Sequence, residues 1–210
     1  MNFSSNFVLS LKSHLMDTQE KRAISLYSEA SPNPNSLKFV ANVMLIPEGV
    51  SRDYPNLESA GDAPLAAALF SEFDFVTRVF YMSNFVTVTK SDDADWFEVK
   101  GTVQQFIKDH LEGGNALLTE EISQTDHAVS DDDTDIEVKI KGILDEYIRP
   151  AVEMDGGAIA FHSFDEGKVK VTLQGSCSGC PSSTVTLKAG IENLLKRMVP
   201  EVTEVEAEDG

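Results

Sequence analysis

Two cysteines, Cys177 and Cys180, are the only ones in the chain, and they lie together in the segment Gly175-Ser-Cys-Ser-Gly-Cys-Pro-Ser-Ser183. Two thiols at this spacing can hold one metal ion from one side, or they can close into a disulfide. They cannot fill the four positions that a structural zinc ion or an iron–sulfur cluster usually demands. Either the motif does redox chemistry alone, or a second copy of the chain supplies the missing thiolates.

The residues around the two cysteines favour reactive thiolates. Pro181 suits the first position of a helix, which places Cys180 at or beside the N-cap. The positive end of a helix favours a thiolate and lowers the pKa of the thiol. Gly175 and Gly179 have no side chains to clash with a bulky inorganic core. We call residues 175–180 the cysteine loop and expect it to hold thiolates outward at a surface.

Several sites are compatible with the C-x-x-C spacing. A thioredoxin-like dithiol also begins a helix with this motif, although such folds place it within βαβ units and a hairpin is expected before it here. A mononuclear zinc or iron site would need His162 or another subunit. A cysteine hydrolase is excluded, because none of the four histidines follows Cys177. A cluster bridging two chains, each contributing Cys177 and Cys180, explains why two cysteines are enough.

Composition narrows the class of protein. The chain has 210 residues, of which 41% are hydrophobic, so it can form one large domain or two small ones. Its net charge of −18 argues against nucleic acid and anionic membranes as partners. No run approaches the roughly 18 apolar residues that span a bilayer. Because the first residues contain little arginine, we expect a cytoplasmic chain with a disordered N-terminus over residues 1–18.

An acidic segment marks the domain boundary. Residues 116–135 carry seven acidic and no basic groups and few large apolar residues. Like charges repel one another, so this segment is predicted to be a flexible, extended linker. It separates a domain over residues 19–115 from one over residues 136–210, and two domains tethered in this way are expected to move independently.

In the first domain the pattern predicts helices packed on one antiparallel sheet. A helix over 62–70 has a proline near its first turn, and a second helix begins at Asp95 and ends at Gly113-Gly114. His110 is expected at the end of that helix in a structural role. Strands are predicted by β-branched and aromatic residues over 37–45, 75–81 and 85–90.

The second domain is predicted to be a compact module of the order α-β-β-loop-α-β. Its first helix begins at Ile136 and becomes irregular at Pro150, and its last helix covers about 182–198. His162 is expected to be structural on a hairpin strand. The strands are predicted over 158–164, 168–173 and 202–205. We therefore expect two small α+β domains, each an antiparallel sheet with helices on one face.

Specific motifs in both domains resemble one known family. Residues 136–206 closely resemble the C-terminal domain of NifU-like (Nfu-type) iron–sulfur cluster carriers, and the first domain is similar to that family's N-terminal domain. The segments that match are Met154-Asp-Gly-Gly157, Leu173-x-Gly-x-Cys-x-x-Cys-Pro-Ser-Ser183, Thr186-Leu-Lys-x-Gly-Ile-Glu192, Pro200-Glu-Val202, Pro32-Asn-Pro-Asn-x-Leu-Lys-Phe39, Pro64-Leu-Ala66, Asp74-Phe75 and Phe85-Val-Thr-Val-Thr-Lys90.

The resemblance implies a carrier rather than an enzyme. Such a carrier binds a cluster, usually [4Fe-4S], between two subunits, and the ligands carried over are Cys177 and Cys180 only. The implied partners are a second copy of the chain, an upstream scaffold donor and apo iron–sulfur client proteins. We expect the N-terminal domain, tethered beside the site, to recognise the clients or the donor. A monomeric dithiol–disulfide oxidoreductase and an acidic adaptor that holds zinc remain the alternatives.

Overall fold

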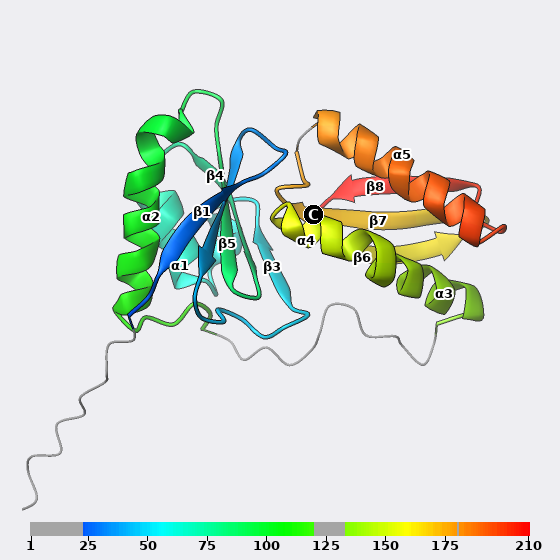
Figure 1. The fold of residues 1–210 in the computed structure, drawn as a ribbon, viewed down its shortest axis with the longest axis horizontal. Helices are drawn as coiled ribbons and strands as arrows, with labels where there is room; N and C mark the ends of the chain where they lie inside the picture. The colour runs from blue at the N-terminus through cyan, green and yellow to red at the C-terminus, as the bar shows by residue number, and fades with distance from the viewer. Residues whose placement is uncertain (1–22, 120–132, 180) are drawn as a thin grey trace, which may run out of the picture.

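The computed structural model describes residues 23–119, 133–179 and 181–210, which form two sheets, each with its own helices (Figure 1). The expected α+β fold is confirmed. The predicted disordered residues 1–18 and most of the predicted linker 116–135 lie outside the described residues. We call residues 23–119 the N-terminal domain and residues 133–210 the C-terminal domain.

The N-terminal domain contains a five-stranded antiparallel sheet. The central strands β2, β5 and β4 are rich in β-branched and aromatic residues, as strands that are buried on both faces require. The hairpin between β4 and β5 turns at Ser83, whose φ of 48° suits a tight turn. The strand order is β1 (Leu26–Ala30), β2 (Ser36–Ala41), β5 (Phe85–Lys90), β4 (Val76–Met82) and β3 (Ser51–Tyr54).

Two α-helices, α1 (Pro64–Glu72) and α2 (Trp96–Glu112), cover one face of this sheet, and a short 3-10 helix, Glu58–Ala60, precedes them. Asp95 caps α2 as expected, because its side chain accepts a hydrogen bond from Phe97 N at 2.9 Å. Asp62 does not cap α1, which begins after Ala63 without a side-chain cap. Its carboxylate instead accepts a hydrogen bond from the Tyr54 hydroxyl at 3.3 Å.

The C-terminal domain begins with a long, interrupted helix. A capping box between Thr134 and Glu137 fixes its start, and a π-helical turn precedes Pro150, which has no N–H to donate to the helix. The expected irregularity is therefore present. The elements are α3 (Asp135–Ile143), the π-helical turn Leu144–Ile148, α4 (Arg149–Met154), β6 (Gly157–Asp165), β7 (Lys168–Gly175), α5 (Pro181–Met198) and β8 (Glu204–Asp209).

The three strands of this domain have the order β6-β7-β8, and β8 pairs with β7 in parallel. The cysteine loop therefore lies between β7 and α5 in a βαβ unit that β8 completes. The sequence predicted a last strand over 202–205 but an antiparallel sheet, and the parallel pairing of β8 with β7 corrects that expectation. Topology is therefore no argument against a dithiol fold. In the part of the chain that is described, no helix is long and apolar enough to cross a membrane.

The two domains contact each other through the face of the first sheet that α1 and α2 leave open (Figure 1). We call this the docking face and define it by Lys38, Val40, Phe80, Phe85 and Thr87, all of which are buried. Val40, Phe80 and Phe85 form an apolar cluster with Ala158 at the start of β6. This contact differs from the independent movement that the linker composition predicts, because the docking face supplies both apolar area and hydrogen bonds.

Candidate functional site

The cysteine loop begins where β7 ends, at the edge of the second domain nearest to the first (Figure 1). Two turn hydrogen bonds shape it, from Cys177 N to Gln174 O at 3.3 Å and from Ser178 N to Gly175 O at 3.2 Å. Cys177 is 7% exposed and packs against the second core. The predicted outward display of this thiol is therefore wrong for the docked chain, in which Cys177 lies against apolar side chains.

Residues 155–157 form the turn between α4 and β6, which we call the glycine turn, and this turn packs against the cysteine loop. Gly156 has a φ of +88°, and its carbonyl accepts a hydrogen bond from Ser176 N at 3.3 Å. A Cβ at Gly157 would lie 2.9 Å from Cys177 Sγ and 2.5 Å from Gln174 O. The pair of glycines therefore creates the room into which the sulfur of Cys177 packs.

Cys177 also lines a pocket of about 420 Å³ at the boundary between the domains. Asp155, Ser176, Thr186 and Leu187 of the C-terminal domain form one part of its wall. Residues 31–33 of the N-terminal domain, a turn with the sequence Ser-Pro-Asn, form the other part. Access to Cys177 through this pocket is consequently bounded by both domains.

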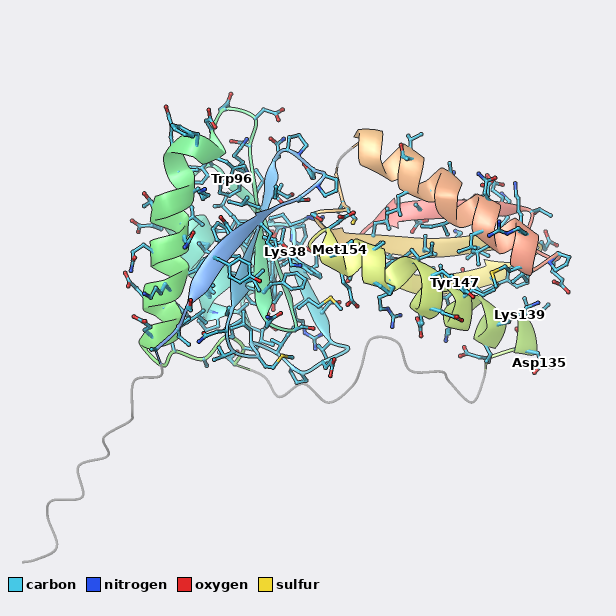
Figure 2. The ribbon with its side chains drawn as sticks, viewed as in Figure 1. Lys38, Trp96, Asp135, Lys139, Tyr147 and Met154 are labelled. Atoms are coloured by element: carbon cyan, nitrogen blue, oxygen red, sulfur yellow. The ribbon has the colours of Figure 1, made fainter. Side chains whose placement is uncertain are left out.

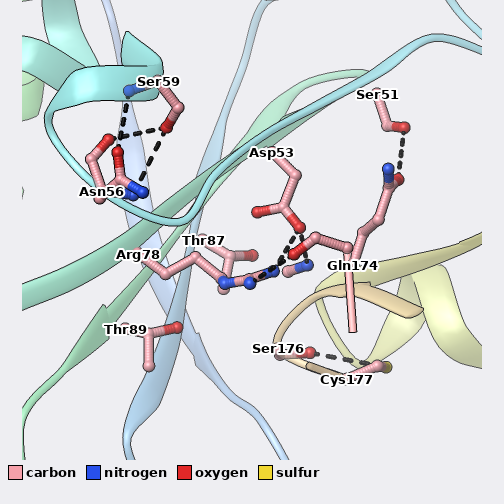
Figure 3. Close-up of polar contacts among 12 residues, drawn as sticks. Ser51, Asp53, Asn56, Ser59, Arg78, Thr87, Thr89, Gln174, Ser176 and Cys177 are labelled. Carbon is pink, nitrogen blue, oxygen red and sulfur yellow. Dashed lines mark hydrogen bonds and ion pairs between the residues drawn. The ribbon is translucent and has the colours of Figure 1, made fainter. Parts of the chain in front are cut away.

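Two N-terminal side chains bind the backbone of the cysteine loop directly. Asn33 Nδ2 donates to Ser176 O at 3.1 Å, and Asp53 Oδ2 accepts from Gly175 N at 3.1 Å. Arg78 lies 2.5 Å from the same carboxylate oxygen, and Figure 3 shows this ion pair near the loop that carries Ser176 and Cys177. The backbone on the N-terminal side of Cys177 is therefore held from two directions.

The glycine turn and the end of α4 also accept hydrogen bonds from side chains of the N-terminal domain. Thr87 Oγ1 donates to Gly156 O at 2.7 Å. Lys38 Nζ donates to Glu153 O and Met154 O at 3.2 and 3.3 Å, and Figure 2 shows Lys38 next to Met154 between the domains. These two carbonyls end α4, where the negative pole of the helix favours a cation.

The electrostatics of the site combine buried carboxyls with a few cations. Burial raises the pKa of Asp155 and of Glu153, and the Lys38 ammonium lowers each of them in part. Burial also raises the pKa of Asp53 to about 6, against the opposing effect of Arg78. The Ser178 hydroxyl is buried without a hydrogen-bond partner among the described residues. It is thus a donor available to a sulfur atom beside Cys177.

The predicted ligands are only partly described. Cys177 is placed as above, whereas Cys180 lies outside the described residues, although α5 does begin at Pro181 as predicted. His162 is exposed on β6, five residues beyond Gly157, which is roughly 16 Å along a strand. His110 lies in the last turn of α2, where burial lowers its pKa. No group of three metal-ligating side chains occurs within the described ranges.

Sequence reasoning missed the N-terminal residues that hold the site. Lys38 and Thr87 alternate with apolar residues along their strands, a pattern that is typical of a sheet face exposed to water. Asn33 lies in a segment for which the sequence predicts no contact with the cysteine loop, and Asp53 lies in a short strand that the sequence does not predict. The resemblance to the family was the available signal, since Asn33 and Lys38 lie in the matching segment 32–39 and Thr87 lies in the matching segment 85–90.

The chain matches two family descriptions. Residues 140–206 match "NifU-like domain", and residues 26–114 match "Scaffold protein Nfu/NifU N terminal". In a solved structure, the NMR structure of a NifU-like protein from Saccharomyces cerevisiae, 92% of that chain aligns with 50% of this one, at 24% identity and a TM-score of 0.43.

Curated relatives are similar over most of the chain. The "NFU1 iron-sulfur cluster scaffold homolog, mitochondrial" of Drosophila willistoni is 41% identical over 91% of this chain and 66% of its own length. "NifU-like protein 4, mitochondrial" of Arabidopsis thaliana is 44% identical over 90% of this chain and 68% of its own length. The chain spans about two thirds of the length of these relatives.

The cytoplasmic location expected from the sequence is wrong, since these relatives are named mitochondrial. That expectation rested on a missing arginine signal, and an absence identifies no compartment.

Proposed function

Because the chain belongs to the NifU-like (Nfu-type) family, we propose that it is an iron–sulfur cluster carrier, in which two copies share one [4Fe-4S] cluster through Cys177 and Cys180 and pass it to apo-proteins. The observation that carries the proposal is the pair of thiols on one loop. Each chain offers two of the four thiolates that such a cluster requires. The cluster is cargo that the chain holds and releases, so no chemical turnover is involved.

The surroundings of Cys177 support this role. The Ser178 hydroxyl, which has no hydrogen-bond partner among the described residues, and the start of α5 provide a hydrogen-bond donor and a positive helix end for a thiolate. Met154 and Val185 are each 69% exposed, and each adjoins a residue that lines the pocket beside Cys177. Apolar side chains at such a rim suit contact with another protein. A second copy and a client protein would both meet this rim.

Two ligands per chain also suit transfer. A thiolate of a client protein can displace one ligand at a time by exchange, while the remaining thiolates still hold the cluster. A site with four ligands from one chain would release its cluster less readily. The donor would be an upstream scaffold, since the chain contains no cysteine beyond Cys177 and Cys180 for accepting sulfur. The names of the relatives support a mitochondrial location.

Anaerobic reconstitution tests the proposal. The chain is incubated with ferrous iron and sulfide, alongside the variants Cys177→Ala and Cys180→Ala. The proposal predicts a brown wild-type protein with a broad band near roughly 400 nm and colourless variants. A colourless wild-type protein that cycles between dithiol and disulfide would instead establish the oxidoreductase, which the βαβ unit around the cysteine loop also accommodates.

A further inference from the structure

The docking face buries polar groups that a free sheet would leave in water. Lys38 and Thr87 are buried although they face away from α1 and α2, and Ser36 on the same face is buried as well. An antiparallel sheet with helices on one face normally exposes the other. Here the residues around Gly156 and Gly175 cover it, and Ala158 completes an apolar cluster with Phe80.

The hydrogen bonds across the boundary are matched to the C-terminal backbone. Asn33 supplies a donor to a carbonyl of the cysteine loop, Lys38 to the carbonyls that end α4, and Thr87 to a carbonyl of the glycine turn. Asp53 supplies the acceptor for the amide of Gly175. A buried carbonyl that lost such a partner would be destabilising, so a surface with these groups at these positions is specific for this one backbone.

The shapes of the two surfaces fit closely. A Cβ at Gly156 would lie 2.9 Å from Thr87 Oγ1, and a Cβ at Gly175 would lie 2.8 Å from Phe80 Cγ. Both glycines also have positive φ, which is a second reason why glycine occupies these two positions. The contact with Phe80 shows that the space beside Gly175 is filled by the N-terminal domain.

We propose that the N-terminal domain is a docked cover for the cysteine loop: its docking face holds the domain in place, and its turn at residues 31–33 shields Cys177 from other molecules in the cluster-free chain. The turn at residues 31–33 forms a wall of the pocket at Cys177, so a larger partner can reach the sulfur only after this domain has moved. The inference goes beyond the proposed function, because it concerns the cluster-free chain and does not depend on the chain being a cluster carrier.

The test measures alkylation of Cys177 in the full chain without iron. Cys180→Ser makes Cys177 the sole thiol, and this parent is compared with a docking variant that adds Asn33→Asp, Lys38→Met and Thr87→Val. Each change removes a donor across the boundary while the residues of the C-terminal domain stay unaltered. A matched control makes the same three kinds of change on or just after α2, on the other side of the N-terminal domain, with Asn115→Asp, Lys108→Met and Thr102→Val.

If the N-terminal domain covers Cys177, the thiol of Cys177 in the parent should react slowly with iodoacetamide. The docking variant should react about tenfold faster or more, and the control should match the parent, because shielded groups react only through local opening. Equal rates for the parent and a docking variant whose circular dichroism is native would refute the cover. Small-angle scattering of the parent gives a test without any docking substitution. A compact particle supports docking, and two separated domains would overturn it.

Discussion

Asp53 on β3 accepts a hydrogen bond at 3.1 Å from the amide of Gly175 at the end of β7, although 122 residues separate the two in the chain. The same carboxylate pairs with Arg78, which also donates to Gly210 O at 2.7 Å. One buried carboxyl thus joins the edge strand of the first sheet to the strand that leads into the cysteine loop. The position of Cys177 therefore depends on both domains.

Asp53 should make stability depend on pH. Burial raises its pKa from 3.8 to about 6 in the folded chain, so the folded state binds this proton more tightly than the unfolded state does. The resulting stability is fully present below about pH 4 and is lost as the pH rises through about 6. Each pKa unit corresponds to about 1.4 kcal/mol, so the effect is at most about 3 kcal/mol.

Urea unfolding from pH 4 to 8 measures this effect against Asp53→Asn, in which the side chain cannot titrate. The wild-type chain should gain free energy of unfolding relative to the variant as the pH falls from 7 to 4. A difference that stays constant over this range would show that Asp53 does not titrate as inferred.

Gly175→Ala and Gly179→Ala form a matched pair within one loop. Both glycines have positive φ, 62° and 73°, so each substitution costs about 1–2 kcal/mol in backbone strain. Only the Cβ at Gly175 would meet Phe80 and Gly156 O, whereas no atom of the described residues lies within 4 Å of the Cβ at Gly179. Thermal unfolding should therefore show a larger loss for Gly175→Ala, by about 1–3 kcal/mol. Equal losses would mean that the Phe80 contact is not formed.

Gly157→Ala should displace Cys177. The new Cβ would lie 2.9 Å from Cys177 Sγ and 2.5 Å from a backbone carbonyl, so the loop or the turn must shift. We expect a loss of about 1–3 kcal/mol in the free energy of unfolding and weaker retention of a reconstituted cluster.

Gly190→Ala in α5 serves as the control for this change, because its Cβ would meet no atom in the described part of the chain and alanine favours a helix by about 1 kcal/mol relative to glycine. It should raise stability and leave cluster retention unchanged. Retention that is normal in Gly157→Ala and lost in Gly190→Ala would contradict the role given to the glycine turn.

The sequence predicted elements wherever one local signal was strong. The Asp95 cap and the Gly113 end located α2, and Pro181 located the start of α5. Strands β1 and β3 were missed because they are short edge strands with charged residues, which interrupt the apolar pattern. The return of β8 parallel to β7 depends on pairing across α5, which a local pattern does not contain.

The candidate site was predictable only as far as its own motif extends. Cys177 and its neighbouring glycines follow from the segment around them. The contacts of Asn33 with the loop and of Lys38 with the end of α4 join residues more than 100 positions apart. Polar side chains on a sheet face give the same alternating pattern whether they face water or a second domain. Composition alone therefore gave no sign of the docking.

Native mass spectrometry of the anaerobically reconstituted chain tests the central claim most directly, because it counts chains and iron atoms in one particle. The account predicts two chains with one cluster of four irons and four sulfides, held by Cys177 and Cys180 of each. In Cys177→Ala, the account predicts a monomer without iron. A wild-type monomer that holds a complete cluster, or a cluster retained by Cys177→Ala, would contradict it.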